Sequence, residues 1–213
     1  LPVITSMAAS DRAYMFFAAN TTSSSIIGDY GIVYHPAYGW MGFRNATWWT
    51  GSGYYSDPAR TWHNGAVFPS GITKVYLHIK VTNTSSEDSI RIRVLNGQNF
   101  SQVLYDETMT YAATEIYNPI NSTFSNLNLY HETTMAQVVP SGGTLNTNTG
   151  SWFQNAIWES AYLYNNTGYW MWGTSQTNDV YRQAPTSGKL STVAINAYTK
   201  WHTNNVSIRF NVP

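Results

Sequence analysis

Cysteine and charge are what this chain lacks most. It contains no cysteine, so neither a disulfide framework nor a zinc site built on thiolates is available to it. Only 10% of its 213 residues are charged, and the formal net charge is zero. Such a surface has no electrostatic footprint for a polyanion, and nucleic acid is therefore not expected as a partner. No stretch approaches the roughly 18 apolar residues of a membrane span, so no span is expected either.

The shortage of carboxylates has a consequence for pH. A fold with few ion pairs has few to lose on acidification, so the sequence predicts a stability that depends weakly on pH and suits an acidic exterior. The first residue is Leu, and no positively charged segment leads into an apolar run. This is typical of a mature chain whose export signal has been removed, so we expect an extracellular, cell-surface protein.

Motifs of catalysis are missing as well. The chain has no G-x-S-x-G elbow, no phosphate-binding loop and no dinucleotide fingerprint. The adjacent acids in residues 87–88 and 106–107 would point to opposite faces of a strand and would serve poorly as a glycosidase pair. Glu115, Glu132 and Glu159 are favoured as surface or hydrogen-bonded groups. No metal-ligand spacing occurs among the five histidines, His35, His63, His78, His131 and His202. We therefore expect no catalytic residue, no metal and no enzyme activity.

What the chain does have is alternation of apolar and polar residues. Residues 72–81, 89–94 and 205–212 alternate most regularly, which predicts strands with one buried and one solvated face. The polar run N-T-S-S-E-D between the first two predicts a hairpin. Weaker strand patterns occupy residues 26–34, 102–107, 110–117, 127–131, 134–139, 168–172 and 190–197.

Helical spacing occurs in one place. Phe153, Ile157 and Ala161 recur at that spacing, which predicts a short helix within residues 151–164. Many short strands with almost no helix predict an all-β fold, an antiparallel β-sandwich of the pilin or immunoglobulin kind. The expected division is an arm and hinge at residues 1–25, followed by a single sandwich body at residues 26–213.

Aromatic residues are abundant, with nine Trp and sixteen Tyr. Aromatic faces stack on sugar rings, and the clusters that would form a sugar platform are Trp40 with Trp48 and Trp49, and Trp170 with Trp172. Large aromatics also dominate ordinary cores and assembly interfaces, and we favour that interpretation here.

Glycan acceptors are spread along the whole chain. Seven triplets of the form N-x-S/T begin at Asn20, Asn45, Asn83, Asn99, Asn121, Asn165 and Asn205. Glycans at these positions would cover a surface that has little charge to keep it soluble. N-linked glycans are the only attached groups expected, and no cofactor is.

The leading segment is the most informative part of the sequence. Residues 1–19 form an apolar arm with one charged pair, Asp11 and Arg12, and the polar run N-T-T-S-S-S at 20–25 follows them. No turn dipeptide follows at hairpin distance, so the partner strand is expected to be distant in sequence or on another molecule. Either the segment is the first strand of its own sandwich, paired for instance with residues 205–212, or it fills a groove in the next copy by β-augmentation.

The exchange alternative leads to a polymer. A head-to-tail contact need not close into a ring, and it then propagates as a filament of identical copies. The residues expected in the donor strand are Leu1, Val3, Ile4, Thr5, Met7, Tyr14 and Phe16.

The layout resembles that of one family. The apolar arm (LPVITSMAAS and AYMFFAA), the polar hinge (NTTSSS), the cysteine-free body rich in Asn, Ser, Thr and Tyr, and the scattered N-x-S/T triplets are similar to the subunits of archaeal threads. These are glycosylated surface filaments of thermoacidophilic archaea, whose pilins join by donor-strand complementation. The resemblance implies that the donor strand lies within residues 1–19, that the seven Asn carry glycans, and that the filament serves adhesion and biofilm formation.

Two other functions stay open on the sequence alone. One is a secreted carbohydrate-binding or glycoside-cleaving β-sandwich, with Trp48, Trp49, Trp170 and Trp172 lining its cleft. The other is an archaeal viral coat protein, which shares the assembly logic of the filament. The expected partners are copies of the chain itself and surface glycans.

Overall fold

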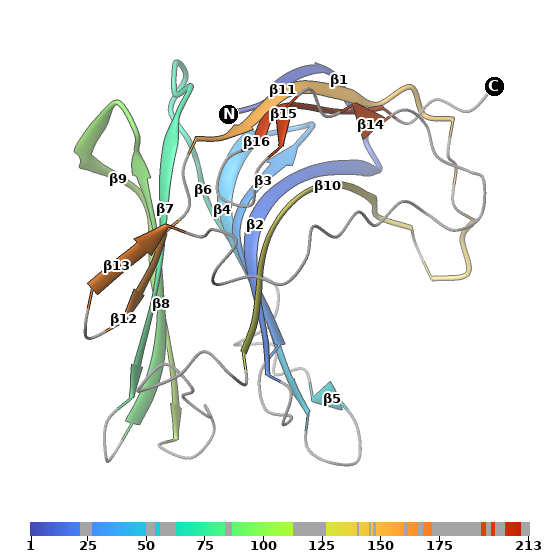
Figure 1. Cartoon of the computed structure of the whole chain (residues 1–213). Helices are drawn as coiled ribbons and strands as arrows, with labels where there is room; N and C mark the ends of the chain where they lie inside the picture. Colours follow the sequence, from blue (N-terminus) through green and yellow to red (C-terminus); the bar gives the residue numbers. More distant parts are fainter. Residues whose placement is uncertain are drawn as a thin grey trace. The chain divides into compact units, whose positions relative to one another are not determined.

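Every regular element in the described part of the chain is a β-strand (Figure 1). The computed structural model describes residues 1–21, 27–49, 54–55, 63–83, 87–112, 127–139, 141–144, 146, 148–159, 162–165, 168–171, 193–194, 197–198 and 203–209. The strand pairs with a defined register are antiparallel, so the expected all-β antiparallel architecture is confirmed. Contacts divide the chain into two compact units, Leu1–Ala13 with Thr133–Pro213, and Tyr14–Glu132. Within the described residues no helix is long and apolar enough to cross a membrane.

The first unit contains a sheet whose outer strand is the start of the chain. Val3 lies opposite Gln154 in this pairing, so the partner of the leading segment is distant in sequence, as expected. Within the single chain the segment therefore pairs with its own body, through residues 152–158 and not through 205–212. The strand order is β1 (Val3–Ser6), β11 (Trp152–Trp158), β16 (Thr203–Arg209) and β14 (Val193–Ala194), with β15 (Ala197–Tyr198) also beside β16.

The helix predicted within residues 151–164 is wrong. That stretch forms β11 and then β12 (Tyr162–Asn165), which pairs with β13 (Gly168–Met171). Asn155 has a φ of 60°, and the register of β11 against β16 shifts between Phe153 and Ala156. This bulge adds one residue, so the fully buried side chains of Phe153 and Ala156 fall three positions apart, whereas Ile157, which suggested the helix, is 41% exposed. Asn tolerates the left-handed conformation better than most residues.

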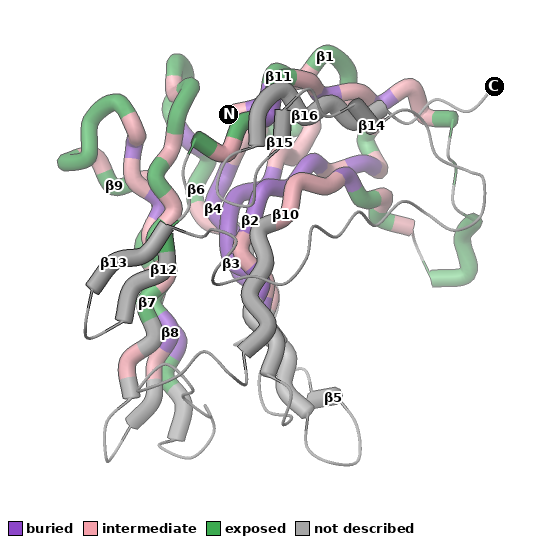
Figure 2. The backbone as a smooth tube through the Cα atoms, viewed as in Figure 1, coloured by how far each residue is buried: buried purple, intermediate pink, exposed green. Residues whose placement is uncertain are grey.

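The second unit contains two sheets, and the first of them holds an apolar cluster that includes Tyr14, Phe16 and Phe43. Its inner strand β2 buries nearly every side chain from Ala13 to Ala18 (Figure 2). Phe43 packs edge-on against Tyr14 and Phe16, with ring centroids 5.4 and 6.0 Å apart. The strand order is β10 (Leu127–Gln137), β2 (Asp11–Thr21), β3 (Ile27–His35), β4 (Gly39–Trp49) and β5 (Tyr54–Tyr55), and β6 (His63–Val67) also pairs with β4.

The hairpin between β3 and β4 was not expected from the sequence. Pro36 stands in its loop, Gly39 has a φ of +105°, and the Tyr38 N–H donates to the His35 carbonyl at 3.0 Å. A type I turn that ends in a left-handed glycine is a common three-residue hairpin loop. The run H-P-A-Y-G was therefore a readable signal that the strand analysis missed.

The other sheet of this unit is the one that the sequence described best. It consists of β7 (Val75–Asn83), β8 (Glu87–Asn96) and β9 (Asn99–Ala112). The predicted hairpin is confirmed, with Ile79 opposite Ile92 and one buried and one exposed face on β8. The two strands expected at 102–107 and 110–117 are one strand as far as residue 112, and those expected at 127–131 and 134–139 are likewise joined in β10. Polar residues in the middle of each strand had looked like breaks.

The ring of Tyr105 lies where the two sheets of the second unit meet. β8 contacts β3, and β9 contacts β4 and β6. Tyr105 of β9 lies over Gly42 and Gly65, where a Cβ atom would come within 2.3 Å of its ring. Beside it, Arg44 Nε donates to Glu107 Oε1 at 2.7 Å, and the Tyr105 hydroxyl donates to the other carboxylate oxygen. Two glycines thus make room for the ring, and an ion pair links the sheets next to it.

Candidate functional site

A buried carboxylate holds the turn that follows β1. Asp11 is fully buried, and its Oδ2 accepts hydrogen bonds from the hydroxyls of Thr149 and Ser151, the latter at 2.6 Å. Ser151 Oγ in turn accepts the Ala8 N–H at 2.8 Å. Asp11 Oδ1 accepts the Ser10 hydroxyl at 2.8 Å. Three of these hydrogen bonds tie residues 8–11 to the segment that leads into β11.

Gln137 completes this network from the end of β10. Its Nε2 donates to Asp11 Oδ1 at 2.9 Å and to the Asn146 carbonyl at 2.9 Å. Its Oε1 accepts the Asn146 N–H at 2.6 Å. The backbones are joined as well, because the Val138 N–H donates to the Ser10 carbonyl at 2.7 Å. The network therefore fastens the leading segment to two parts of the chain that lie more than a hundred residues away.

The network keeps its carboxylate ionised. Burial raises the pKa of Asp11, but the hydrogen bonds from Ser151, Thr149, Gln137 and Ser10 lower it by more, so the pKa lies below its ordinary value. The donors are hydroxyls and an amide, which do not titrate in the same range. Acidification therefore leaves this attachment intact until the carboxyl itself takes up a proton.

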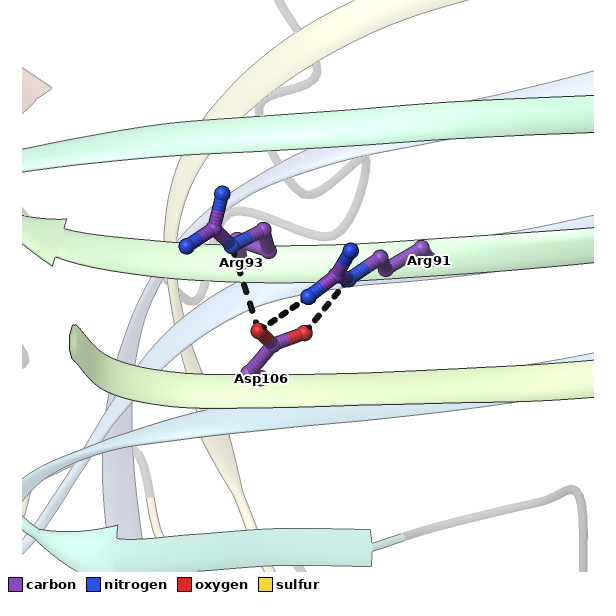
Figure 3. Close-up of polar contacts among 3 residues, drawn as sticks. All are labelled: Arg91, Arg93 and Asp106. Carbon is purple, nitrogen blue, oxygen red and sulfur yellow. Dashed lines mark hydrogen bonds and ion pairs between the residues drawn. The ribbon is translucent and has the colours of Figure 1, made fainter.

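The second polar cluster lies on the exposed face of the β7–β8–β9 sheet. Asp106 accepts a two-pronged contact from Arg91, with Nε–Oδ1 at 2.7 Å and Nη2–Oδ2 at 2.6 Å (Figure 3). Arg93 Nε lies 3.2 Å from the same Oδ2. The strand register places His78 opposite Arg93 and Lys80 opposite Arg91. Two arginines thus hold one carboxylate, with Lys80 on the neighbouring strand, in a chain that has only 11 Lys and Arg in all.

Electrostatics at this face act on two neighbouring groups. The Arg91 guanidinium holds the pKa of Asp106 below its ordinary value. Partial burial lowers the pKa of His78, and Arg93, Lys80 and Arg91 lower it further. Burial is the larger cause, and the neighbouring cations add to it, so the charges on this face act against protonation of His78.

Exposed aromatic rings adjoin the cations. Tyr76 and Phe100 are 46% and 62% exposed, and their rings meet edge-on with centroids 5.7 Å apart. The Tyr76 ring also stacks on His78 at 6.3 Å. Rings next to guanidinium groups form a surface on which a sugar carrying a negative charge could lie.

The residues expected in a donor strand fall into two groups. Leu1, Val3, Ile4, Thr5 and Met7 lie in or beside β1, where Val3 is 51% exposed and no side chain of the strand itself is buried. Tyr14 and Phe16 lie in the apolar cluster of β2, β3 and β4 of the same chain. The structure therefore does not bring the seven side chains together on one face.

The glycan acceptors differ in their surroundings. Asn99 is exposed at the β8–β9 turn, and its Oδ1 accepts the Ser101 hydroxyl at 2.7 Å. Asn45 is half-buried opposite Asp29 and hydrogen-bonds that carboxyl. Asn20, Asn83, Asn165 and Asn205 belong to strands whose side chains at those positions fall outside the description, and Asn121 lies outside the described residues. Of the two acceptors whose side chains are described, Asn99 is thus the more accessible.

The remaining candidates are only partly described. Trp40 is half-buried and packs edge-on against Tyr34 at 5.4 Å. Trp48 and Trp49 lie opposite Tyr55 and Tyr54 in the strand register, and Trp170 lies opposite Leu163. Trp172 and Glu115 lie outside the described residues. Among the residues that are described, no group of three or more His, Asp or Glu could hold a metal ion.

Sequence reasoning missed the Asp11 network. The signal was a lone acid inside an apolar segment, since a carboxylate that is carried into a core must be hydrogen-bonded there. Its partners could not be named, because Gln137, Thr149 and Ser151 are far away in sequence and nothing local distinguishes them.

Comparison with family models, with curated proteins and with solved structures finds nothing that matches this chain. The function proposed below therefore depends on the residues and geometry of the chain itself.

Proposed function

We propose that this protein is a structural subunit of an extracellular, glycosylated filament that serves adhesion and biofilm formation. Its body is a β-sandwich, and residues 1–19 of one copy complete the sheets of the next copy, head to tail. No catalysis is part of this function. Copies of the chain are the partners, and glycans at the N-x-S/T triplets cover the surface.

One observation carries the proposal. The leading segment supplies the outer strand β1 to one sheet and most of the inner strand β2 to another, so residues 1–19 complete two sheets. When identical copies exchange such a stretch, each receives from its neighbour the contacts that it otherwise makes by itself. The closed single chain and the exchanged polymer then contain the same strand pairs. The polar run at 20–25 is the hinge that connects the exchanged segment to the body.

The absence of cysteine makes a sharp test possible. Val3 and Gln154 lie opposite each other in the β1–β11 pair, within the range that a disulfide can bridge. We would unfold a mixture of chains carrying Val3→Cys and chains carrying Gln154→Cys, refold them together, oxidise them and separate them under non-reducing conditions. Exchange predicts a disulfide between the two kinds of chain, since β1 of one then lies on β11 of the other.

The matched control replaces the second variant by Gln98→Cys, at an exposed turn far from β11 in sequence. Random collision would link Val3→Cys equally well to either partner. A chain that keeps its own β1 gives no selective link, and the double variant Val3→Cys/Gln154→Cys then runs only as a cross-linked monomer. That result, together with negative-stain images without fibres, would exclude the filament.

Carbohydrate recognition is a second candidate, and the exposed face of the β7–β8–β9 sheet favours it. Tyr76 and Phe100 offer rings there, and Arg91 and Arg93 offer charge. Binding of an acidic oligosaccharide should raise the pKa of His78, because the bound anion offsets the neighbouring cations. An NMR titration of the His78 ring with and without uronic-acid oligomers measures this, and unchanged titration curves would remove the candidate.

A further inference from the structure

The Asp11 network contains the parts of a self-catalysed cross-link. Asp11 Oδ1 contacts two groups at once, the Ser10 hydroxyl at 2.8 Å and the Gln137 amide nitrogen at 2.9 Å. Ser10 Oγ and Gln137 Nε2 are 3.5 Å apart. A hydroxyl and a carboxamide therefore lie side by side on one carboxylate oxygen, which is the arrangement that acyl transfer needs between a nucleophile, a base and a leaving group.

The carbonyl of the same amide is polarised. Gln137 Oε1 accepts the Asn146 N–H at 2.6 Å, and a backbone donor at this position stabilises the negative charge that develops on the oxygen during attack. Asp11 is fully buried and held from its other side by Thr149 and Ser151, so its geometry is preorganised. The lowered pKa of Asp11 keeps the base ionised in mild acid.

We propose that Ser10 and Gln137 become joined by an ester bond, with Asp11 as the proton carrier. Ser10 Oγ attacks Gln137 Cδ and passes its proton to Asp11 Oδ1. The Cδ–Nε2 bond breaks, Asp11 returns the proton to the departing nitrogen, and one ammonia leaves. Atoms and charge balance without any other reactant, because an amide and an alcohol give an ester and ammonia.

The cross-link would do for this chain what a disulfide does in others. It closes a loop between residues 10 and 137 and prevents the leading segment from leaving β10. Where that segment comes from a neighbouring copy, which rests on the proposed function, the same reaction joins the two copies covalently. The bond itself does not depend on exchange, because the network is complete within one chain.

The test is the intact mass of the full chain, produced where no N-glycans are added and shown by circular dichroism to be folded. We expect the protein to be lighter than its sequence by one ammonia, and fragmentation to give a branched peptide that contains Ser10 and Gln137. Hydroxylamine should cleave the link and leave a hydroxamate at residue 137. A folded protein with the full sequence mass overturns the proposal, as does a link to Thr149 or Ser151 in place of Ser10.

Variants test whether Ser10 is the nucleophile and Asp11 the proton carrier. Ser10→Ala should restore the full sequence mass, and Asp11→Asn should slow ammonia loss at least tenfold. The matched control is Ser101→Ala, which removes a hydroxyl that lies 2.7 Å from the Asn99 amide oxygen. This control should still lose one ammonia. If a variant does not fold, the intact mass of the folded natural chain still decides whether the ester forms. Denaturing gels report separately on exchange, since a lighter protein that runs as a monomer keeps the ester and contradicts the filament.

Discussion

The ring of Tyr105 occupies the space that a side chain at Gly65 would need. A Cβ atom on Gly65 would lie 2.3 Å from Cδ2 of that ring and 2.8 Å from Cε2. Gly42 approaches the same residue from β4, where a Cβ would lie 2.3 Å from Cγ and 2.6 Å from the Tyr105 Cβ. The approach of the two sheets in the second unit thus depends on two missing side chains and one large ring.

This geometry predicts a selective rescue. Gly65→Ala should lower the free energy of unfolding by about 1–3 kcal/mol through overpacking. In a Tyr105→Ala background the same change should have almost no effect, because every close contact at Gly65 is to ring atoms. Gly42→Ala should stay destabilising in that background, since the Cβ of residue 105 remains. Urea unfolding of the single and double variants measures this, and equal rescue at both glycines would contradict it.

The ion pair beside Tyr105 should matter more than the exposed one. Arg44 and Glu107 side chains are 7% and 22% exposed. Arg44→Met leaves the Glu107 carboxylate without this partner in a largely buried position, which should cost about 3 kcal/mol, whereas Arg44→Met/Glu107→Gln, which removes the charge and keeps an acceptor for the Tyr105 hydroxyl, should regain part of that loss. Arg91→Met is the matched control on the open face and should cost much less, because solvent screens an exposed ion pair. Equal losses at residues 44 and 91 would show that burial does not decide the effect.

Asp29 should make the protein more stable in acid. Burial raises its pKa to about 6, Glu132 adds to this, and Asn45 opposes it. Because the folded pKa is above the unfolded value of about 3.9, the stabilisation is complete below pH 4 and is lost as the pH rises through 6. Asp29→Asn should match the natural chain near pH 3.5 and exceed it by up to about 2 kcal/mol at pH 7.5. Urea titrations across this range check the slope, and parallel curves would contradict the assignment.

Asp11 should lower the stability of the protein in strong acid, which is the opposite of the effect of Asp29. Its folded pKa is below its ordinary value, so its contribution is present above about pH 4 and is lost as the pH falls through the folded pKa. Asp11→Asn loses the charge-assisted hydrogen bonds from Thr149 and Ser151, which remain after residues 10 and 137 are joined, and should lose about 2 kcal/mol at pH 6, with a smaller deficit near pH 2. Together with Asp29 this places the maximum of stability in the mildly acidic range, which a thermal scan from pH 2 to 8 would locate.

Local pattern was sufficient for the β7–β8 hairpin. In this hairpin every second side chain is apolar, and the polar connection is short, so neighbouring residues alone define both strands and their faces. The opposite case is β11, where the bulge at Asn155 moves the buried positions from a period of two to three. A bulge depends on the partner strand, so no local pattern could show that Ala156 is buried and Ile157 exposed.

In the candidate sites, too, local sequence indicates single residues but not their partners. The polar face that carries Arg91 and Arg93 follows from alternation alone, but its pairing with Asp106 needs the register of β9. Asp11 stood out in the sequence as a charge in an apolar segment, while its partners did not.

The sequence by itself determined that this protein is built of antiparallel strands, because alternation and turn residues act over a few neighbours. Only the tertiary structure decided that β1 pairs with β11, that Tyr105 lies over two glycines, and that Ser10, Asp11 and Gln137 share one hydrogen-bond network. Such contacts join residues that are dozens of positions or more apart along the chain. Their energies depend on packing, burial and register, which exist only once the chain has folded.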